Sequence, residues 1–310
     1  MTTIRAFLEL PAGLASVSLA LQGGARCRPP ISRMGNKAGY AATILDVLGL
    51  RPGQGAGAYW WAEADPDVAA LLRIYPDPDA LREVARIIRG WAGEEPRALW
   101  ERLRAERRAR GAARGTVEKV AGYLIEGAWA YRQGDPPSGG PVLPEDRRQS
   151  AVRDSDGVAA LTGWRPTTAG ISGCADAFAC LGWPPVRVSP CIPSAAEVAA
   201  AIGTPGDLSG CVVYADPPYA GTTGYAHDLP RAEVVQYCLA YAAMGATVCV
   251  SEQSPIPELM QAGWYATEIT ADRVGAKRTF SKQQAEWLTM STPPKRRQIG
   301  LFNLDEVLHA

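Results

Sequence analysis

Four consecutive residues, Asp216-Pro217-Pro218-Tyr219, have the clearest chemical potential, because they directly follow the apolar run 211–215. Such a run is typical of a parallel strand that is buried on both faces. Ligands of open parallel sheets bind outside the carboxyl ends of strands, so Asp216 is expected in a cleft. The prolines stiffen the turn, and the Pro217 carbonyl stays free to accept a hydrogen bond. A carboxylate, a rigid carbonyl and an aromatic ring suit a flat ligand with an exocyclic amine; the alternative is a plain strand-to-loop turn.

A second turn of interest follows the first expected strand. Residues 4–10 alternate in polarity and end at Pro11-Ala12-Gly13, which is typical of a strand followed by a tight turn. The apolar segment 15–21 then favours a buried helix. This region therefore predicts a strand, a turn and a helix in immediate succession.

An acidic turn follows the next expected strand. The bulky run 58–62 predicts a short buried strand, and it ends at Glu63 and Asp65. Pro66 and the neighbouring carboxylates are typical of the first turn of a helix. The acids therefore lie where a strand gives way to a helix.

The composition excludes several classes of protein. Lys and Arg together number 32, as do Asp and Glu, so the chain is not uniformly basic. Two histidines leave almost nothing for a His-based triad or a His-rich metal centre, and we expect no metal. The seven cysteines include no Cys-x-x-Cys pair, which favours buried thiols in a reducing compartment. The apolar stretch 7–24 is interrupted by Glu9 and Pro11, so we expect neither a signal peptide nor a membrane span.

Strands alternate with helices over most of the sequence, which predicts an α/β fold with a doubly wound, mostly parallel sheet. The alternation weakens between residues 96 and 194, and residues 157–194 read as irregular. We therefore expect 1–95 and 195–310 to form the core and 96–194 to form an inserted subdomain. The expected strands are 4–10, 58–62, 211–215, 246–250, 265–270 and 286–290, and the expected helices are 15–21, 39–48, 79–91, 97–110, 231–244 and 257–261.

With these motifs the sequence resembles a known family, the amino-group DNA methyltransferases, and especially their Dam-type, adenine-specific branch. Residues 216–225 resemble its Asp-Pro-Pro-Tyr motif, which is followed by a Thr and an aromatic residue. Residues 7–17 resemble its cofactor motif, although Pro11 replaces the usual Phe and Ala15 the second Gly. The acidic turn 63–67 also resembles that family, and the matches span roughly 1–90 and 207–290.

One further motif resembles the family but stands at a different place in the order of motifs. Residues 33–37 resemble the Gly-Gly-Lys element of the family, which normally precedes the cofactor motif, whereas here it follows. Lys37 is then expected to meet the carboxylate of the cofactor or the target base. The alternative is a solvated lysine.

The resemblance implies a Rossmann-like methyltransferase fold that uses S-adenosylmethionine (SAM). The turn with Gly13 would let the backbone approach SAM closely. Glu63 would accept hydrogen bonds from the ribose, and Asp65 reads more as a helix cap. The implied catalytic residues are Asp216, Pro217, Pro218 and Tyr219, and the implied SAM-binding residues are Glu9, Pro11, Ala12, Gly13, Lys37, Glu63, Asp65 and Asp216.

The partner implied by the resemblance is double-stranded DNA, from which the target adenine would be flipped out and stacked on Tyr219. Residues 96–194 would then serve target recognition, and the host would be a bacterium or its phage, with a cytoplasmic modification enzyme. Residues 97–110 are rich in arginine, which favours contacts with DNA phosphates. Glutamates alternate with these arginines, so the alternative is a helical face that is simply exposed to solvent. The expected DNA contacts are Arg104, Arg107, Arg108, Thr223 and Tyr225.

Three other functions remain open at this stage. The enzyme could methylate the exocyclic amine of cytosine or a base in RNA. A relative that binds DNA without turnover is suggested by the altered cofactor turn with Pro11 and Ala15. An α/β protein that binds some other nucleotide is the third possibility.

Overall fold

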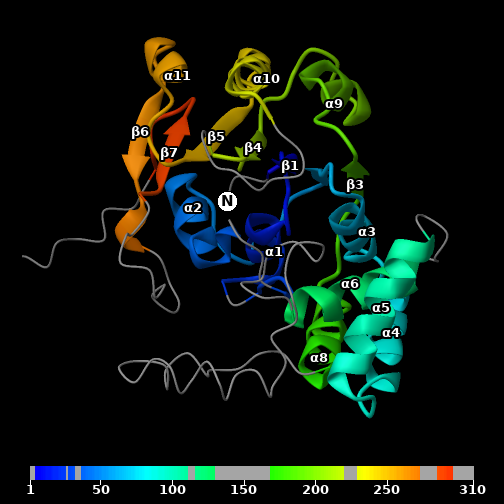
Figure 1. Cartoon of the computed structure of the whole chain (residues 1–310). Helices are drawn as coiled ribbons and strands as arrows, with labels where there is room; N and C mark the ends of the chain where they lie inside the picture. Colours follow the sequence, from blue (N-terminus) through cyan, green and yellow to red (C-terminus); the bar gives the residue numbers. More distant parts are fainter. Residues whose placement is uncertain are drawn as a thin grey trace, which may run out of the picture.

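A seven-stranded sheet forms the middle layer of the computed structural model, and helices cover both of its faces (Figure 1). The structure describes residues 4–25, 27–31, 36–110, 116–129, 168–219, 229–272 and 285–295. In sheet order, the strands are β3 (Val186–Ser189), β2 (Tyr59–Ala62), β1 (Ala6–Glu9), β4 (Cys211–Ala215), β5 (Thr247–Glu252), β7 (Trp287–Met290) and β6 (Tyr265–Glu268).

The order of the strands places a topological switch at the centre of the sheet. Strands β3, β2, β1, β4 and β5 are parallel to one another, and β7 runs antiparallel to β5 and β6 on either side of it. The chain moves outward from β1 toward β3 and then returns to the other side of β1 at β4. Ligands of doubly wound sheets bind at this reversal, outside the carboxyl ends of the strands. The expected α/β class with a mostly parallel sheet is confirmed.

Alternate side chains of each strand pack against different helical layers. Phe7 of β1 and Tyr214 of β4 face one layer, whereas Leu8 and Val213 face the other. This explains the continuous apolar runs of the sequence, because a strand covered on both faces has no solvated side. The first layer contains α1 (Ser16–Gly23), α2 (Ala41–Val47) and α3 (Pro66–Ile74); the second contains α9 (Ala195–Ala201), α10 (Arg231–Ala243) and α11 (Pro257–Gln261).

Four further helices form a group beside α3 (Figure 1). In this group α4 packs against α6 and α8, and α6 also packs against α3 and α5. Its buried residues are continuous with the core beneath β1 and β2. The helices are α4 (Pro78–Gly90), α5 (Pro96–Arg110), α6 (Thr116–Trp129) and α8 (Thr168–Phe178).

The expected insert 96–194 extends too far toward the C-terminus. The sequence predicted irregular structure over 157–194, but α8 and β3 lie there, and β3 is the edge strand of the sheet. The short β3 was missed because its side chains are only half-buried and lack an apolar run. The sheet therefore resumes at Val186, inside the stretch that was expected to be separate.

Candidate functional site

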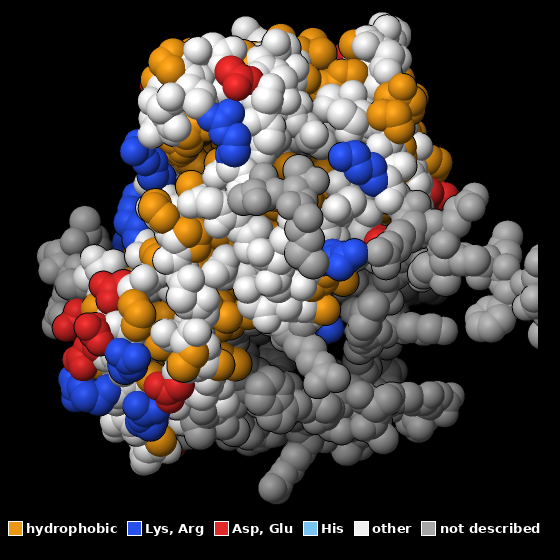
Figure 2. Space-filling model, turned by 180° about the vertical axis from the view of Figure 1, so that it is seen from behind, with side chains coloured by type: hydrophobic (Ala, Val, Ile, Leu, Met, Phe, Trp, Pro, Cys, Tyr) orange, Lys and Arg blue, Asp and Glu red, His pale blue; other side chains and the backbone are white. Residues whose placement is uncertain are grey.

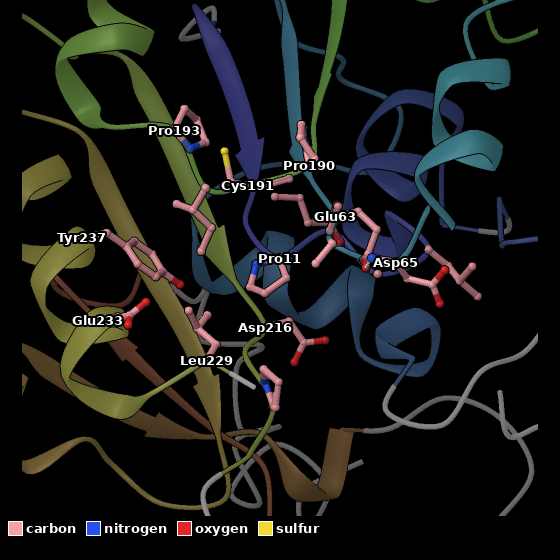
Figure 3. Close-up of a pocket in the computed structure, with 18 of the residues that line it drawn as sticks. Pro11, Glu63, Asp65, Pro190, Cys191, Pro193, Asp216, Leu229, Glu233 and Tyr237 are labelled. Atoms are coloured by element: carbon pink, nitrogen blue, oxygen red, sulfur yellow. Dashed lines mark hydrogen bonds between the residues drawn. The ribbon is translucent and has the colours of Figure 1, made fainter. Parts of the chain in front are cut away.

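A cavity of about 830 Å³ opens at the carboxyl ends of β1, β2, β3 and β4 (Figure 3). Glu63 and Asp65 lie on one side of Pro11, and Glu233 and Tyr237 lie on the other. Gly13 and Asp216 both line this cavity, so the two turns singled out in the sequence meet in one place. The expected site residues that line it are Glu9, Pro11, Ala12, Gly13, Lys37, Glu63, Asp65, Asp216 and Pro218.

The turn between β1 and α1 has an unusual backbone. Gly13 and Ala15 both have left-handed conformations, with φ of 50° and 52°. Such a conformation favours glycine, and it costs an alanine roughly 1–2 kcal/mol. A glycine at the position of Ala15 would adopt this conformation without that cost, and this chain forms the turn with an alanine.

Glu9 ends β1 and holds the start of α1. Its carboxylate accepts hydrogen bonds from the backbone N–H of Ser18 at 2.8 Å and from the Ser18 hydroxyl at 2.6 Å. The backbone N–H of Val17 also donates to it, at 3.3 Å. Burial outweighs these hydrogen bonds and raises the pKa of Glu9 to about 7. Glu9 therefore shapes the turn that faces the cavity, because its carboxylate is committed to α1.

The two acids after β2 have different tasks. Asp65 caps α3 by accepting hydrogen bonds from the backbone N–H groups of Asp67 and Val68. The Glu63 carboxylate accepts a hydrogen bond from the backbone N–H of Asp65 at 2.9 Å and still borders the cavity. Asp65 thus has the capping task that the sequence favoured, and Glu63 has the better position for a ligand.

Lys37 joins this site to the turn after β4. Its ammonium lies 2.7 Å from a carboxylate oxygen of Asp216, and its side chain is only 5% exposed. The alternative of a solvated lysine is therefore wrong. Burial raises the pKa of Asp216, while the neighbouring ammonium of Lys37 opposes this rise.

Tyr219 points toward a buried acid that the sequence did not single out. Its hydroxyl donates to the Glu286 carboxylate, with 2.7 Å to each oxygen, and the Lys37 ammonium lies 4.6 Å from its ring centre. Of the expected catalytic residues, Asp216 and Pro218 line the cavity, whereas Pro217 and Tyr219 are not among its lining residues. One face of the ring is therefore in contact with a cation in this structure.

Sequence reasoning also missed two walls of the cavity. One is the segment 190–195 after β3, and the other is the face of α10 that carries Glu233 and Tyr237. Two tyrosines spaced four residues apart tie α10 to the loops of the site. The Tyr237 hydroxyl donates to the Leu10 carbonyl at 3.1 Å, and that of Tyr241 to the Pro193 carbonyl at 2.9 Å. This spacing on one helical face was the available signal.

The expected DNA contacts are only partly described by the structure. On α5, Arg104 lies with its guanidinium 4.7 Å from the ring centre of Trp100. Its neighbour Arg102 pairs with Glu94 at 2.8 Å and with Glu106 at 3.4 Å. Acidic and basic side chains are interspersed over this helical group, at the lower left of Figure 2. The side chains of Arg107 and Arg108, and all of Thr223 and Tyr225, lie outside the described residues.

The described α5 favours the solvated-face interpretation over a phosphate site. The pairing of Arg102 with glutamates neutralises the charge that a phosphate would need. None of the side chains of α5 that the structure describes lines the cavity. Arg104 as a DNA contact thus stays a prediction without support from its surroundings.

The cavity is acidic and suits a cationic ligand. Four carboxylates line it in addition to Glu9, namely Glu63, Asp65, Asp216 and Glu233, against the single ammonium of Lys37 among its lining residues. In the described parts of the chain, no cluster of His, Cys, Asp or Glu is arranged to hold a metal ion. Every helix in the same parts is too short or too polar to span a bilayer.

Comparisons with known proteins do not assign the chain to a family. No family model matches the chain, and no curated protein sequence is significantly similar to it.

Proposed function

We propose that this protein is a SAM-dependent methyltransferase that methylates the exocyclic amine of adenine in double-stranded DNA. The observation that carries the proposal is one acidic cavity at the topological switch that Glu63, Gly13 and Asp216 share. The sequence had predicted these residues to meet, and a different placement of the 216–219 turn would have removed the basis for the proposal.

The residues of the cavity fit SAM better than a phosphate-bearing nucleotide. SAM carries a sulfonium, an ammonium and a ribose but no phosphate, so a mostly acidic wall attracts it. Glu63 would accept hydrogen bonds from the ribose hydroxyls, and Lys37 would lie near the carboxylate of SAM or the target base. The same wall would repel phosphates, which argues against the third alternative.

The turn after β4 has the groups that methyl transfer to an amine needs. Asp216 and the Pro217 carbonyl would accept the two N–H groups and hold the nitrogen lone pair toward the donor methyl. When bound, SAM supplies a methyl group on a positively charged sulfur. The amine nitrogen would take the methyl group as its bond to sulfur breaks, sulfur would keep the electron pair, and the cationic amine would then lose a proton to water. The carboxylate of Asp216 favours the positive charge that grows on nitrogen.

The target base must leave the duplex, because an exocyclic amine inside a stack cannot reach the cavity. The direct test is incubation of the protein with methyl-labelled SAM and duplex DNA from a methylation-free host. Label in N6-methyladenine after digestion to nucleosides supports the proposal. Label in cytosine or only in RNA favours the runner-up, and no label in any nucleic acid contradicts a methyltransferase of this class.

The inactive DNA-binding relative receives no support from the cofactor turn. Pro11 and Ala15 together motivated that alternative, but Ala15 holds the left-handed conformation that a glycine would adopt there. The alanine by itself is therefore no argument for an altered turn. Binding of DNA without any binding of SAM in calorimetry would restore this alternative.

Replacing Glu63 with glutamine is expected to weaken SAM binding by roughly 10- to 100-fold, because hydrogen bonds to a charged group contribute about 1.5–3 kcal/mol. The rate at saturating SAM should remain unchanged, since Glu63 is assigned to the ribose. The measurement is the Kd by calorimetry. Asp77→Asn is the matched control: Asp77 caps α4 and does not line the cavity, and asparagine can still cap the helix, so its Kd should stay near that of the wild type. Equal effects of the two substitutions would contradict the assignment to Glu63.

Two exposed cysteines provide an internal test of where SAM binds. Cys191 lines the cavity, whereas Cys180 follows α8 and lies outside the cavity wall. Saturating SAM is expected to slow alkylation of Cys191 severalfold and to leave Cys180 unaffected. Peptide mass spectrometry over a time course of maleimide labelling measures both rates in one sample. Protection of neither thiol, or of both equally, would speak against SAM in this cavity.

A further inference from the structure

Glu286 is a buried acid that reaches the site from the far end of the sequence. It precedes β7, and its side chain is 7% exposed. Because β7 is antiparallel to β5, its first residue, Trp287, pairs with Glu252 at the last position of β5. An antiparallel strand thus begins at the edge where the parallel strands end, and this geometry puts Glu286 beside Tyr219.

The contacts of Glu286 fix two groups of the candidate active site. Both of its carboxylate oxygens lie 2.7 Å from the Tyr219 hydroxyl, and one lies 3.9 Å from the Lys37 ammonium. Its own backbone N–H donates to the Thr270 hydroxyl at 2.9 Å, which anchors it on the other side. Glu286 therefore holds Tyr219 in a defined orientation and competes with Asp216 for Lys37.

Charge balance gives this arrangement a chemical consequence. Lys37 and Asp216 alone form a neutral pair, 2.7 Å apart. With Glu286 included, two carboxylates share one ammonium, and the cluster has a net negative charge when both acids are ionised. A positive charge that grows on a nearby amine is stabilised by a net negative surrounding and gains little from a neutral one.

We propose that Glu286 is a positioning residue for methyl transfer, holding the Tyr219 hydroxyl and sharing Lys37 so that Asp216 keeps an effective negative charge toward the amine. This inference rests on the proposed methyltransferase function and adds a residue to it. Burial raises the pKa of Glu286, and Lys37 opposes the rise, so the cluster is also sensitive to pH.

The test uses Glu286→Gln, which can keep a hydrogen bond to Tyr219 but removes the charge. The kcat for DNA methylation is expected to fall roughly 10- to 100-fold. The KM for SAM should stay within about twofold, because Glu286 does not line the cavity. Loss of the neighbouring carboxylate lowers the pKa of Asp216, so the acid limb of the kcat profile should move to lower pH. If Glu286 had a purely structural role, the acid limb of the pH profile would stay in place. The substitution would then not lower kcat while leaving the KM for SAM unchanged.

Matched variants separate the possible outcomes. Glu268→Gln removes an exposed carboxylate on the neighbouring β6, and it should leave kcat and the pH limb unchanged. Glu286→Asp keeps the charge and should retain the wild-type pH limb with a smaller loss of kcat. If Glu286→Gln does not fold, Tyr219→Phe removes the same hydrogen bond from the other side and should also lower kcat without raising the KM for SAM.

The result also distinguishes this inference from the proposed function. Wild-type protein that labels no nucleic acid overturns both. Active wild-type protein together with a Glu286→Gln variant of unchanged kcat and unchanged pH limb overturns only the role of Glu286.

Discussion

Replacing Asp216 with asparagine is expected to lower kcat for DNA methylation by about 10²- to 10³-fold, a loss that is typical when a group that stabilises transition-state charge is removed. The asparagine amide keeps the shape of the side chain but not its negative charge. SAM should still bind, because the remaining acids of the cavity are unchanged. Incorporation of labelled methyl groups at saturating SAM and DNA measures the rate, and calorimetry measures SAM binding.

The control for this substitution is an aspartate at the other end of β4. Asp207 lies in the loop before β4, is 52% exposed and pairs with Arg5 at 3.3 Å. Asp207→Asn should leave the rate within about twofold of the wild type, since surface ion pairs contribute little. An Asp216→Asn variant with nearly full activity and normal SAM binding would show that the turn after β4 is not the reaction centre.

Replacing Glu9 with glutamine is expected to remove a large part of the pH dependence of stability. The pKa of Glu9 rises from 4.5 to about 7 on folding, so the folded state holds a proton that the unfolded state has released. The stability contributed by this group is full below pH 4.5 and is lost as the pH rises to 7. The loss amounts to about 3 kcal/mol, at about 1.4 kcal/mol per pKa unit.

Urea unfolding of the ligand-free protein at a series of pH values measures this difference. Between pH 4.5 and 8 the wild-type free energy of unfolding should fall by about 3 kcal/mol more than that of Glu9→Gln. Glu197 is a control of opposite sign, because hydrogen bonds from Ser194 lower its pKa. Glu197→Gln should lose stability relative to the wild type only as the pH rises from that lowered pKa to 4.5, and its curve should run parallel to the wild type above pH 4.5. Parallel curves for Glu9→Gln and the wild type would contradict the buried environment of Glu9.

Local sequence signals were strong enough for much of the core. The predicted limits of β4 and of α11 agree with the structure residue for residue, since a strand bounded by a charged turn and a helix begun by proline are short-range patterns. The same kind of signal located Asp216, Gly13 and Glu63 at the ends of strands. Sheet topology then explains why they meet, because parallel strands present their carboxyl ends at one edge.

Other parts of the fold have weaker local patterns, such as the Ser194–Glu197 capping box that begins α9. The edge strand β3 has half-buried side chains, and α6, α8 and α9 lie where the sequence predicted no regular element. The stability of these elements comes from contacts with distant segments, such as α4 on α8 and β2 on β3. Intrinsic preference is too weak to decide such cases.

The sequence by itself indicated the class of fold, the turn after β4 and the acids at the ends of β1 and β2, because each of these depends on neighbouring residues. Only the tertiary structure decided that Lys37 is buried against Asp216 and that Glu286 holds Tyr219. Those residues lie far apart in the chain and come together through strand order and the antiparallel direction of β7. Long-range electrostatics of this kind depend on burial and distance, and neither quantity is written in the local sequence.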